Sequence, residues 1–66
     1  MQLLINGQST EMPAELTARQ LVERLELAGK RIALEVNGEV VPRSGYDSRQ
    51  LRQGDKVEIV HAIGGG

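Results

Sequence analysis

The residues best suited to chemistry are the three glycines at the end of the sequence, Gly64, Gly65 and Gly66, which directly follow the largely apolar run 56–63. Glycine has no Cβ atom, so such an end can pass through a narrow channel in which a larger residue would clash. Fully extended, residues 62–66 reach roughly 17 Å, far enough to enter a neighbouring active site. The sequence therefore predicts a carrier whose reactive group is the carboxylate of Gly66, on the slender stalk of Gly65 and Gly64.

A side-chain active site is harder to find. His61 is the one histidine, and a lone histidine on a strand is more often an exposed polar residue than a general base. The sequence has no cysteine to pair with it, and Ser44 and Ser48 belong to a separate predicted loop. No acidic or histidine residues have the spacing of a metal site. We therefore expect a carrier protein rather than an enzyme, with no cofactor or metal of its own.

Four basic residues lie in the predicted loop and at the start of the last strand: Arg43, Arg49, Arg52 and Lys56. This group could dock an acidic partner or neutralise a nucleotide phosphate. A solvated loop is the simpler interpretation, and we favour it. The single glycines elsewhere do not form a phosphate-binding loop, because none precedes a helix at the needed spacing.

Composition narrows the class of protein further. Sixty-six residues make one small domain, and without cysteines its core must come from side-chain packing alone. A net charge of −1 and a single aromatic residue, Tyr46, argue against nucleic-acid binding. The apolar runs are too short for a membrane span, and the N-terminus does not resemble a signal peptide. We expect a cytoplasmic protein with neither nucleic acid nor membrane as a partner.

Two Asn-Gly pairs predict two hairpins. The first hairpin pairs strand 1–5 with strand 8–12, which Pro13 ends. The second pairs strand 32–36 with a short return strand that begins at residue 39. Gly54 and Asp55 predict a turn that leads into the last strand.

The helix between the hairpins has clear start signals. Thr17 and Gln20 have the spacing of a capping box, while Leu16 and Leu21 have that of a hydrophobic staple. An apolar stripe follows at helical intervals, and Gly29 is the expected end. The stripe comprises Ala18, Leu21, Val22, Leu25 and Ala28. A short helical turn is expected near 48–51.

This order of elements predicts an α+β fold of the β-grasp type. Four to five strands form a mixed sheet packed on one main helix, with the first and last strands parallel and adjacent at its centre. We expect residues 1–61 to form this domain and residues 62–66 to form a flexible tail.

Strand alternation also predicts a surface for partners. Leu3, Ile5, Val57 and Ile59 should face the helix, which leaves the opposite face to Leu4, Val60 and Ala62, while Ile63 lies where the tail leaves the domain. An apolar patch on an exposed sheet face indicates partner binding, although small proteins also expose aliphatic residues without such a role.

Residues 33–43 contain N-G-E-x-V-P-R, and residues 51–66 contain G-D-x-V/I-E-I-x-x-A-I-G-G-G. These two segments resemble the ThiS family of sulfur carriers in bacterial thiazole synthesis. Either motif alone is weak evidence, but the resemblance covers essentially the whole chain.

The resemblance implies a ubiquitin-like β-grasp fold and a defined route for sulfur. A ThiF-type adenylyltransferase would activate the carboxylate of Gly66 with ATP and magnesium, with Gly65 as its required slender neighbour. A cysteine desulfurase would supply the sulfur, and the resulting thiocarboxylate would donate it to thiazole synthase, ThiG.

Other functions remain open at this point. The small subunit of molybdopterin synthase has a similar fold and glycine end, but it is usually longer. A carrier for cysteine synthesis or tRNA thiolation is a further possibility. From a different class, a ubiquitin-like modifier or plain binding module would use the sheet face without sulfur chemistry.

Overall fold

The computed structural model of the chain describes residues 1–61, so the predicted tail, with site residues Ala62, Ile63, Gly64, Gly65 and Gly66, lies outside the described residues. The described part contains β1 (Gln2–Ile5), β2 (Gln8–Glu11), α1 (Ala18–Arg24), β3 (Ile32–Val36), β4 (Glu39–Val41) and β5 (Lys56–His61). A short 3-10 helix, η1 (Arg43–Gly45), lies between β4 and β5.

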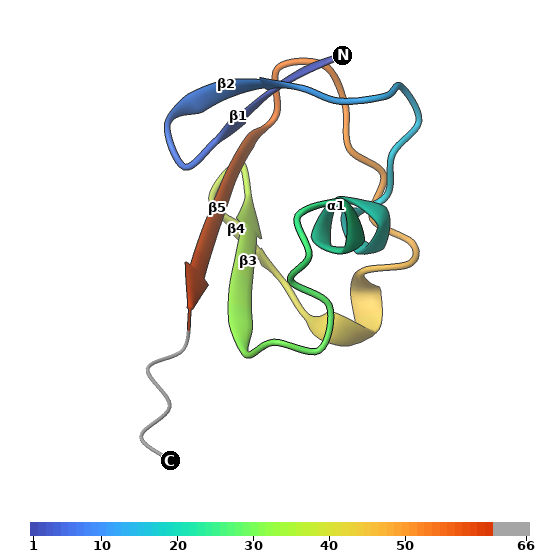
Figure 1. Ribbon diagram of the computed structural model, residues 1–66, viewed down its shortest axis with the longest axis vertical. Coiled ribbons are helices and arrows are strands. Elements are labelled where there is room, and N and C mark those ends of the chain that lie inside the picture. The colour runs from blue at the N-terminus through green and yellow to red at the C-terminus, as the bar shows by residue number, and fades with distance from the viewer. Residues whose placement is uncertain (62–66) are drawn as a thin grey trace.

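The five strands form one mixed sheet in the order β2-β1-β5-β3-β4. β1 and β5 are parallel neighbours, while β1–β2, β3–β4 and β3–β5 are antiparallel pairs. α1 lies on one side of this sheet (Figure 1). The β-grasp prediction is confirmed, including the central place of the first and last strands.

Both predicted hairpins form with tight two-residue turns. Asn6 and Gly7 have φ angles of 49° and 84°, and Asn37 and Gly38 have φ angles of 53° and 85°. Positive φ at both central residues is what a type I′ turn requires, and asparagine followed by glycine tolerates it best. The turns fix the register of both hairpins and therefore decide which side chains face the helix.

The start of α1 follows the predicted capping box. The Thr17 hydroxyl accepts a hydrogen bond from the Gln20 backbone N–H at 3.2 Å. In return, Gln20 Oε1 accepts one from the Thr17 backbone N–H at 2.9 Å. Two donors that a helix start would leave unpaired are thus satisfied.

The predicted end of the helix at Gly29 was wrong, because α1 ends at Arg24. The Leu27 N–H bonds to Val22 O at 2.9 Å, and the Glu26 N–H bonds to Glu23 O at 3.0 Å. These two bonds form a Schellman motif, in which Glu26 takes the left-handed position with φ 59°. Ala28, which the sequence placed in the apolar stripe, lies beyond the helix and is exposed.

The helical turn expected at 48–51 is also misplaced, since it lies at η1. Pro42 precedes it with an extended backbone, and the Gly45 N–H bonds to Pro42 O at 2.8 Å. Residues 50 and 51 instead lie against the segment that precedes α1, where the Leu51 N–H bonds to Leu16 O at 2.8 Å. Pairing with a distant segment thus prevents a local helical turn there.

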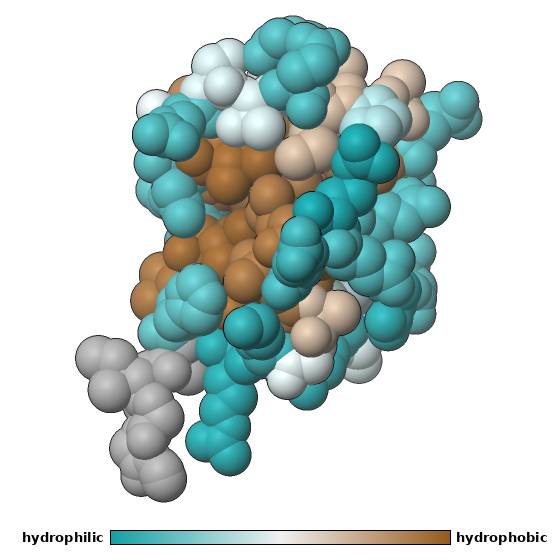
Figure 2. Space-filling model, viewed as in Figure 1, coloured by the Kyte–Doolittle hydropathy of each residue, from teal (hydrophilic) through white to brown (hydrophobic). Residues whose placement is uncertain are grey.

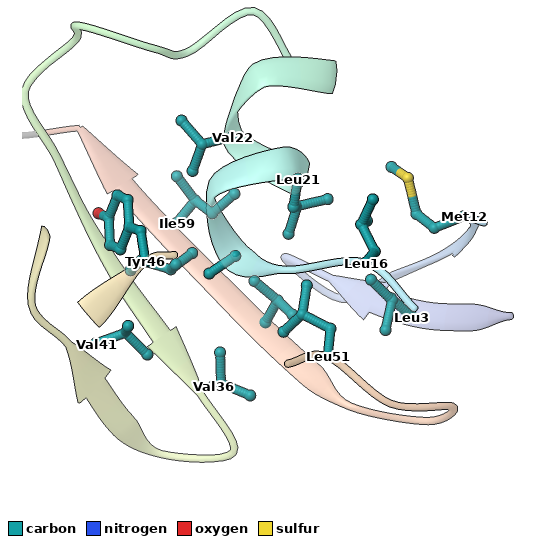
Figure 3. Packing of buried hydrophobic residues seen from close by; sticks show 13 residues of the cluster. Leu3, Met12, Leu16, Leu21, Val22, Val36, Val41, Tyr46, Leu51 and Ile59 are labelled. Atoms are coloured by element: carbon teal, nitrogen blue, oxygen red, sulfur yellow. The ribbon is translucent and has the colours of Figure 1, made fainter. Parts of the chain in front are cut away.

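The core lies between α1 and the inner face of the sheet (Figure 3). Its central side chains are fully buried: Leu3, Leu21, Leu34, Val36 and Val57. Other apolar side chains pack against this core but remain partly exposed: Met1, Ile5, Leu25, Leu27 and Ile32. Figure 2 shows apolar residues gathered in the middle of this view, with hydrophilic residues around them. Large core truncations such as Leu34→Ala cost about 2–5 kcal/mol in general, much of the stability of a small domain.

Candidate functional site

The outer face of the sheet, turned away from α1, holds the predicted partner residues that the structure describes. Val57 and Ile59 of β5 are buried, so Val60 projects from the opposite face, where it is 59% exposed. Leu4 lies between buried Leu3 and partly buried Ile5 on β1, and it is itself partly exposed. The predicted orientation of both residues agrees with this burial pattern.

The structure does not join Leu4 and Val60 into one apolar patch. Leu4 is the register partner of Lys56 on β5, and Val60 lies four residues further along that strand, roughly 13 Å away. On this face of β5, Lys56 lies beside Leu4, and Glu58 lies between Lys56 and Val60. The immediate neighbour of Val60 is Ala33, its register partner on β3.

Two features of this face were missed by sequence reasoning. Val40 of β4 is 68% exposed, and it lies opposite Glu35 of β3. Glu35 in turn lies directly opposite Glu58 of β5. The position of Val40 could have been predicted from the sequence, because the two-residue turn at Asn37-Gly38 fixes residue 40 opposite residue 35.

A side chain from the first hairpin holds the last strand in place. The Asn6 backbone N–H donates to Val57 O at 2.8 Å, where β1 ends. Its side chain then continues the ladder: Oδ1 accepts from the Ile59 N–H at 2.8 Å, and Nδ2 donates to the Ile59 C=O at 3.3 Å. β5 is therefore anchored to within two residues of His61, the last described residue.

A second set of contacts fixes the beginning of β5. The Asp55 carboxylate accepts hydrogen bonds from the Arg52 N–H at 2.8 Å and from Asn37 Nδ2 at 3.0 Å. Asn37 Oδ1 accepts from the Lys56 N–H at 3.0 Å. Asp55 thus serves the turn, as predicted, and asparagine side chains hold β5 at its first residue and at Ile59.

The other sequence candidates do not assemble into a catalytic site. His61 is exposed at the end of β5, whereas Ser44 lies in η1 and the Ser48 hydroxyl donates to Gly45 O at 3.3 Å. Among residues 1–61, no group of three or more His, Cys, Asp or Glu side chains could hold a metal ion. In that same range, no helix is long and apolar enough to cross a membrane.

The basic group is partly engaged in structural contacts. Arg49 pairs with Glu39 at 3.2 Å, and Arg43 Nη2 donates to the Lys30 C=O at 3.3 Å. Near them, the Arg19 guanidinium donates to the Asp47 carboxylate, and this hydrogen bond raises the pKa of Arg19. These contacts agree with the favoured interpretation of a solvated loop.

In a comparison with known proteins, nearly the whole chain matches one protein family. The model of the ThiS family matches residues 3–66, a range that includes the three terminal glycines. The sulfur carrier protein ThiS of Escherichia coli is 32% identical over 66 residues, and the match covers 100% of both chains. The crystal structure of the thiamine biosynthesis protein (ThiS) from Geobacter metallireducens superposes with a TM-score of 0.87 at 32% identity, again covering 100% of both chains.

A second kind of relative is much longer. A thiazole synthase from Paramagnetospirillum magneticum is 41% identical over all 66 residues, and one from Magnetococcus marinus is 36% identical. The chain spans 20% of the length of each of these two proteins.

Proposed function

We propose that this chain, which belongs to the ThiS family of sulfur carriers in thiamine biosynthesis, carries sulfur as a thiocarboxylate on Gly66. The observation that carries the proposal is the full-length match to a sulfur carrier protein, with the same fold and with the family model extending through the terminal glycines. In this role the domain supplies recognition, and its partner enzymes, which we place in the cytoplasm, supply catalysis.

Loading requires activation of the carboxylate, because a free carboxylate is a poor acyl donor. An oxygen of Gly66 attacks the α-phosphorus of ATP at a ThiF-type adenylyltransferase, with magnesium as the partner's ion, and pyrophosphate leaves. The terminal sulfur of a desulfurase persulfide then attacks the acyl-adenylate carbon and displaces AMP. A thiol reduces the resulting acyl disulfide, which leaves the thiocarboxylate on the carrier. No side chain of residues 1–61 is needed for any of these steps.

The fold supports this role by positioning the tail. β5 lies at the centre of the sheet, between β1 and β3, and runs away from the N-terminus (Figure 1). The asparagine contacts fix the strand at its first residue, Lys56, and at Ile59, two residues before its end. These contacts hold the strand from which the tail starts at a fixed position relative to the outer face of the sheet.

Thiazole synthase, ThiG, is the proposed acceptor of the sulfur. Two relatives that carry this name contain a segment similar to the entire chain. Domains joined in one protein commonly act on the same intermediate, so the proposed carrier would deliver its thiocarboxylate to thiazole synthase. Mass analysis of the intact chain after incubation with a ThiF-type enzyme, ATP, a desulfurase and cysteine tests the loading step.

A further inference from the structure

The outer sheet face places two carboxylates directly opposite each other, an arrangement in which like charges generally destabilise a sheet. Glu35 and Glu58 are register partners on β3 and β5, the two most extensively paired strands. The Asn37 N–H bonds to Lys56 O at 2.7 Å, and alternation along the ladder makes Glu35 and Glu58 a hydrogen-bonded pair. Side chains so placed have Cβ atoms roughly 5 Å apart, where like charges repel.

Neither Glu35 nor Glu58 forms an ion pair with a cation of the described chain. The ion pairs among residues 1–61 are Met1–Glu11, Arg19–Asp47 and Arg49–Glu39, and neither Glu35 nor Glu58 takes part in one. Lys56 lines the same shallow hollow with Asn37 and Gly38, but it pairs with neither carboxylate. The negative charge of this face is therefore available to another molecule.

Exposed apolar side chains flank the two carboxylates. Val40 lies beside Glu35 in the same row across the sheet, and Val60 follows Glu58 on the same face of β5. Val40 and Val60 are the exposed large hydrophobic residues of the described chain. A charged centre with apolar flanks is the arrangement in which an arginine forms a strong contact, because its guanidinium bridges carboxylates while its stem packs on apolar groups.

We infer that Glu35 and Glu58 together bind an arginine of the activating enzyme, with Val40 and Val60 seated against apolar side chains around it. The inference rests on the proposed function, since it specifies the chemistry of the partner surface. Charge complementarity supports this occupant: the repulsion that destabilises the free face becomes an attraction for one guanidinium.

The test compares charge-neutral variants of similar shape. Glu35→Gln and Glu58→Gln should keep the fold and raise Tm slightly, by about 2–4 °C, because the repulsion is removed. The Kd for a ThiF-type enzyme, measured by calorimetry at low salt, should rise about tenfold for each variant. Glu58→Lys should raise it further. Glu23→Gln, a matched change on the exposed side of α1, should leave Kd unchanged.

The salt dependence of binding and the loading of the chain with sulfur distinguish failure of this inference from failure of the proposed function. Binding of the two Gln variants should weaken less with added salt than binding of the wild type, because one charge contact is gone. If both Gln variants bind the enzyme with the Kd of the wild type, the inference is overturned. The proposed function would still be supported in that case if the wild type is loaded as a thiocarboxylate. A wild type that neither binds nor is loaded would overturn both.

Discussion

The side chain of Asn6 forms two hydrogen bonds with the backbone of Ile59, one accepted by Oδ1 at 2.8 Å and one donated by Nδ2 at 3.3 Å. Asn6 is also the first of the two central residues of a type I′ turn, with φ 49°. One residue therefore closes the first hairpin and continues the β1–β5 ladder where β1 has ended. The position of the last strand depends on a turn 53 residues earlier in the sequence.

Replacement of Asn6 by glycine isolates the side-chain contacts, because glycine tolerates the same positive φ. We expect Asn6→Gly to lower the free energy of unfolding by about 1–2 kcal/mol, the net value of two hydrogen bonds. Amide hydrogen exchange should show lost protection at Ile59, whereas Val60, which pairs with Ala33 on the other side, should keep its protection. An Ile59 amide as protected as in the wild type would contradict this assignment.

The capping box at the start of α1 should contribute measurably to stability. Thr17→Ala removes the hydroxyl that accepts from the Gln20 N–H, and we expect a loss of about 1 kcal/mol in the free energy of unfolding. Urea denaturation measures this loss. Thr17→Ser, which keeps the hydroxyl, should stay close to wild type; an equal loss in both variants would show that the hydrogen bond is not the cause.

The end of α1 offers a stabilising substitution. Glu26 is exposed and has φ 59°, a conformation that favours glycine. Glu26→Gly should therefore raise the free energy of unfolding by about 0.5–1 kcal/mol. The matched change Glu23→Gly, inside α1, should lower it by about 1 kcal/mol. Thermal unfolding of both variants measures the contrast, and destabilisation by Glu26→Gly would rule out the left-handed cap.

A substitution of Val60 tests whether the outer face of the sheet binds the partner, and it leaves Glu35 and Glu58 unchanged. Val60→Asp places a charge on an exposed position, so the fold should remain intact. We expect weaker binding to the activating enzyme, by about tenfold, because a charged group would be buried against an apolar surface. Ala28→Asp, at an exposed position beyond α1, is the control and should bind normally. Unchanged affinity of Val60→Asp in calorimetry would exclude this residue from the interface.

Local patterns predicted the parts of the fold that short-range physics determines. The Asn-Gly pairs and the Thr17–Gln20 box act over two to four residues, and each formed as expected. The end of α1 did not form at the predicted position, Gly29. Hydrogen bonds of the Schellman motif outweighed the cost of a left-handed conformation at Glu26. The turn expected at 48–51 was misplaced because Leu51 bonds to Leu16, which is far away in sequence.

In the candidate site, too, local patterns predicted some features, and others depend on contacts between distant segments. Alternation along the strands placed Leu4 and Val60 on the outer face, but it did not reveal that Lys56 and Glu58 separate them. That separation depends on the parallel register of β1 and β5, which no short turn fixes. The contact between Asn6 and Ile59 depends on the same register, so no local pattern indicates it.

The most direct test of the carrier role is intact mass spectrometry after incubation with a ThiF-type enzyme, ATP, a desulfurase and cysteine. We predict the exchange of one oxygen for sulfur in the wild type, located at Gly66 by fragmentation. A variant that lacks Gly66 should gain no sulfur, and Glu23→Gln should be loaded normally. An unchanged wild-type mass, with an enzyme that loads its own carrier in parallel, would contradict the account.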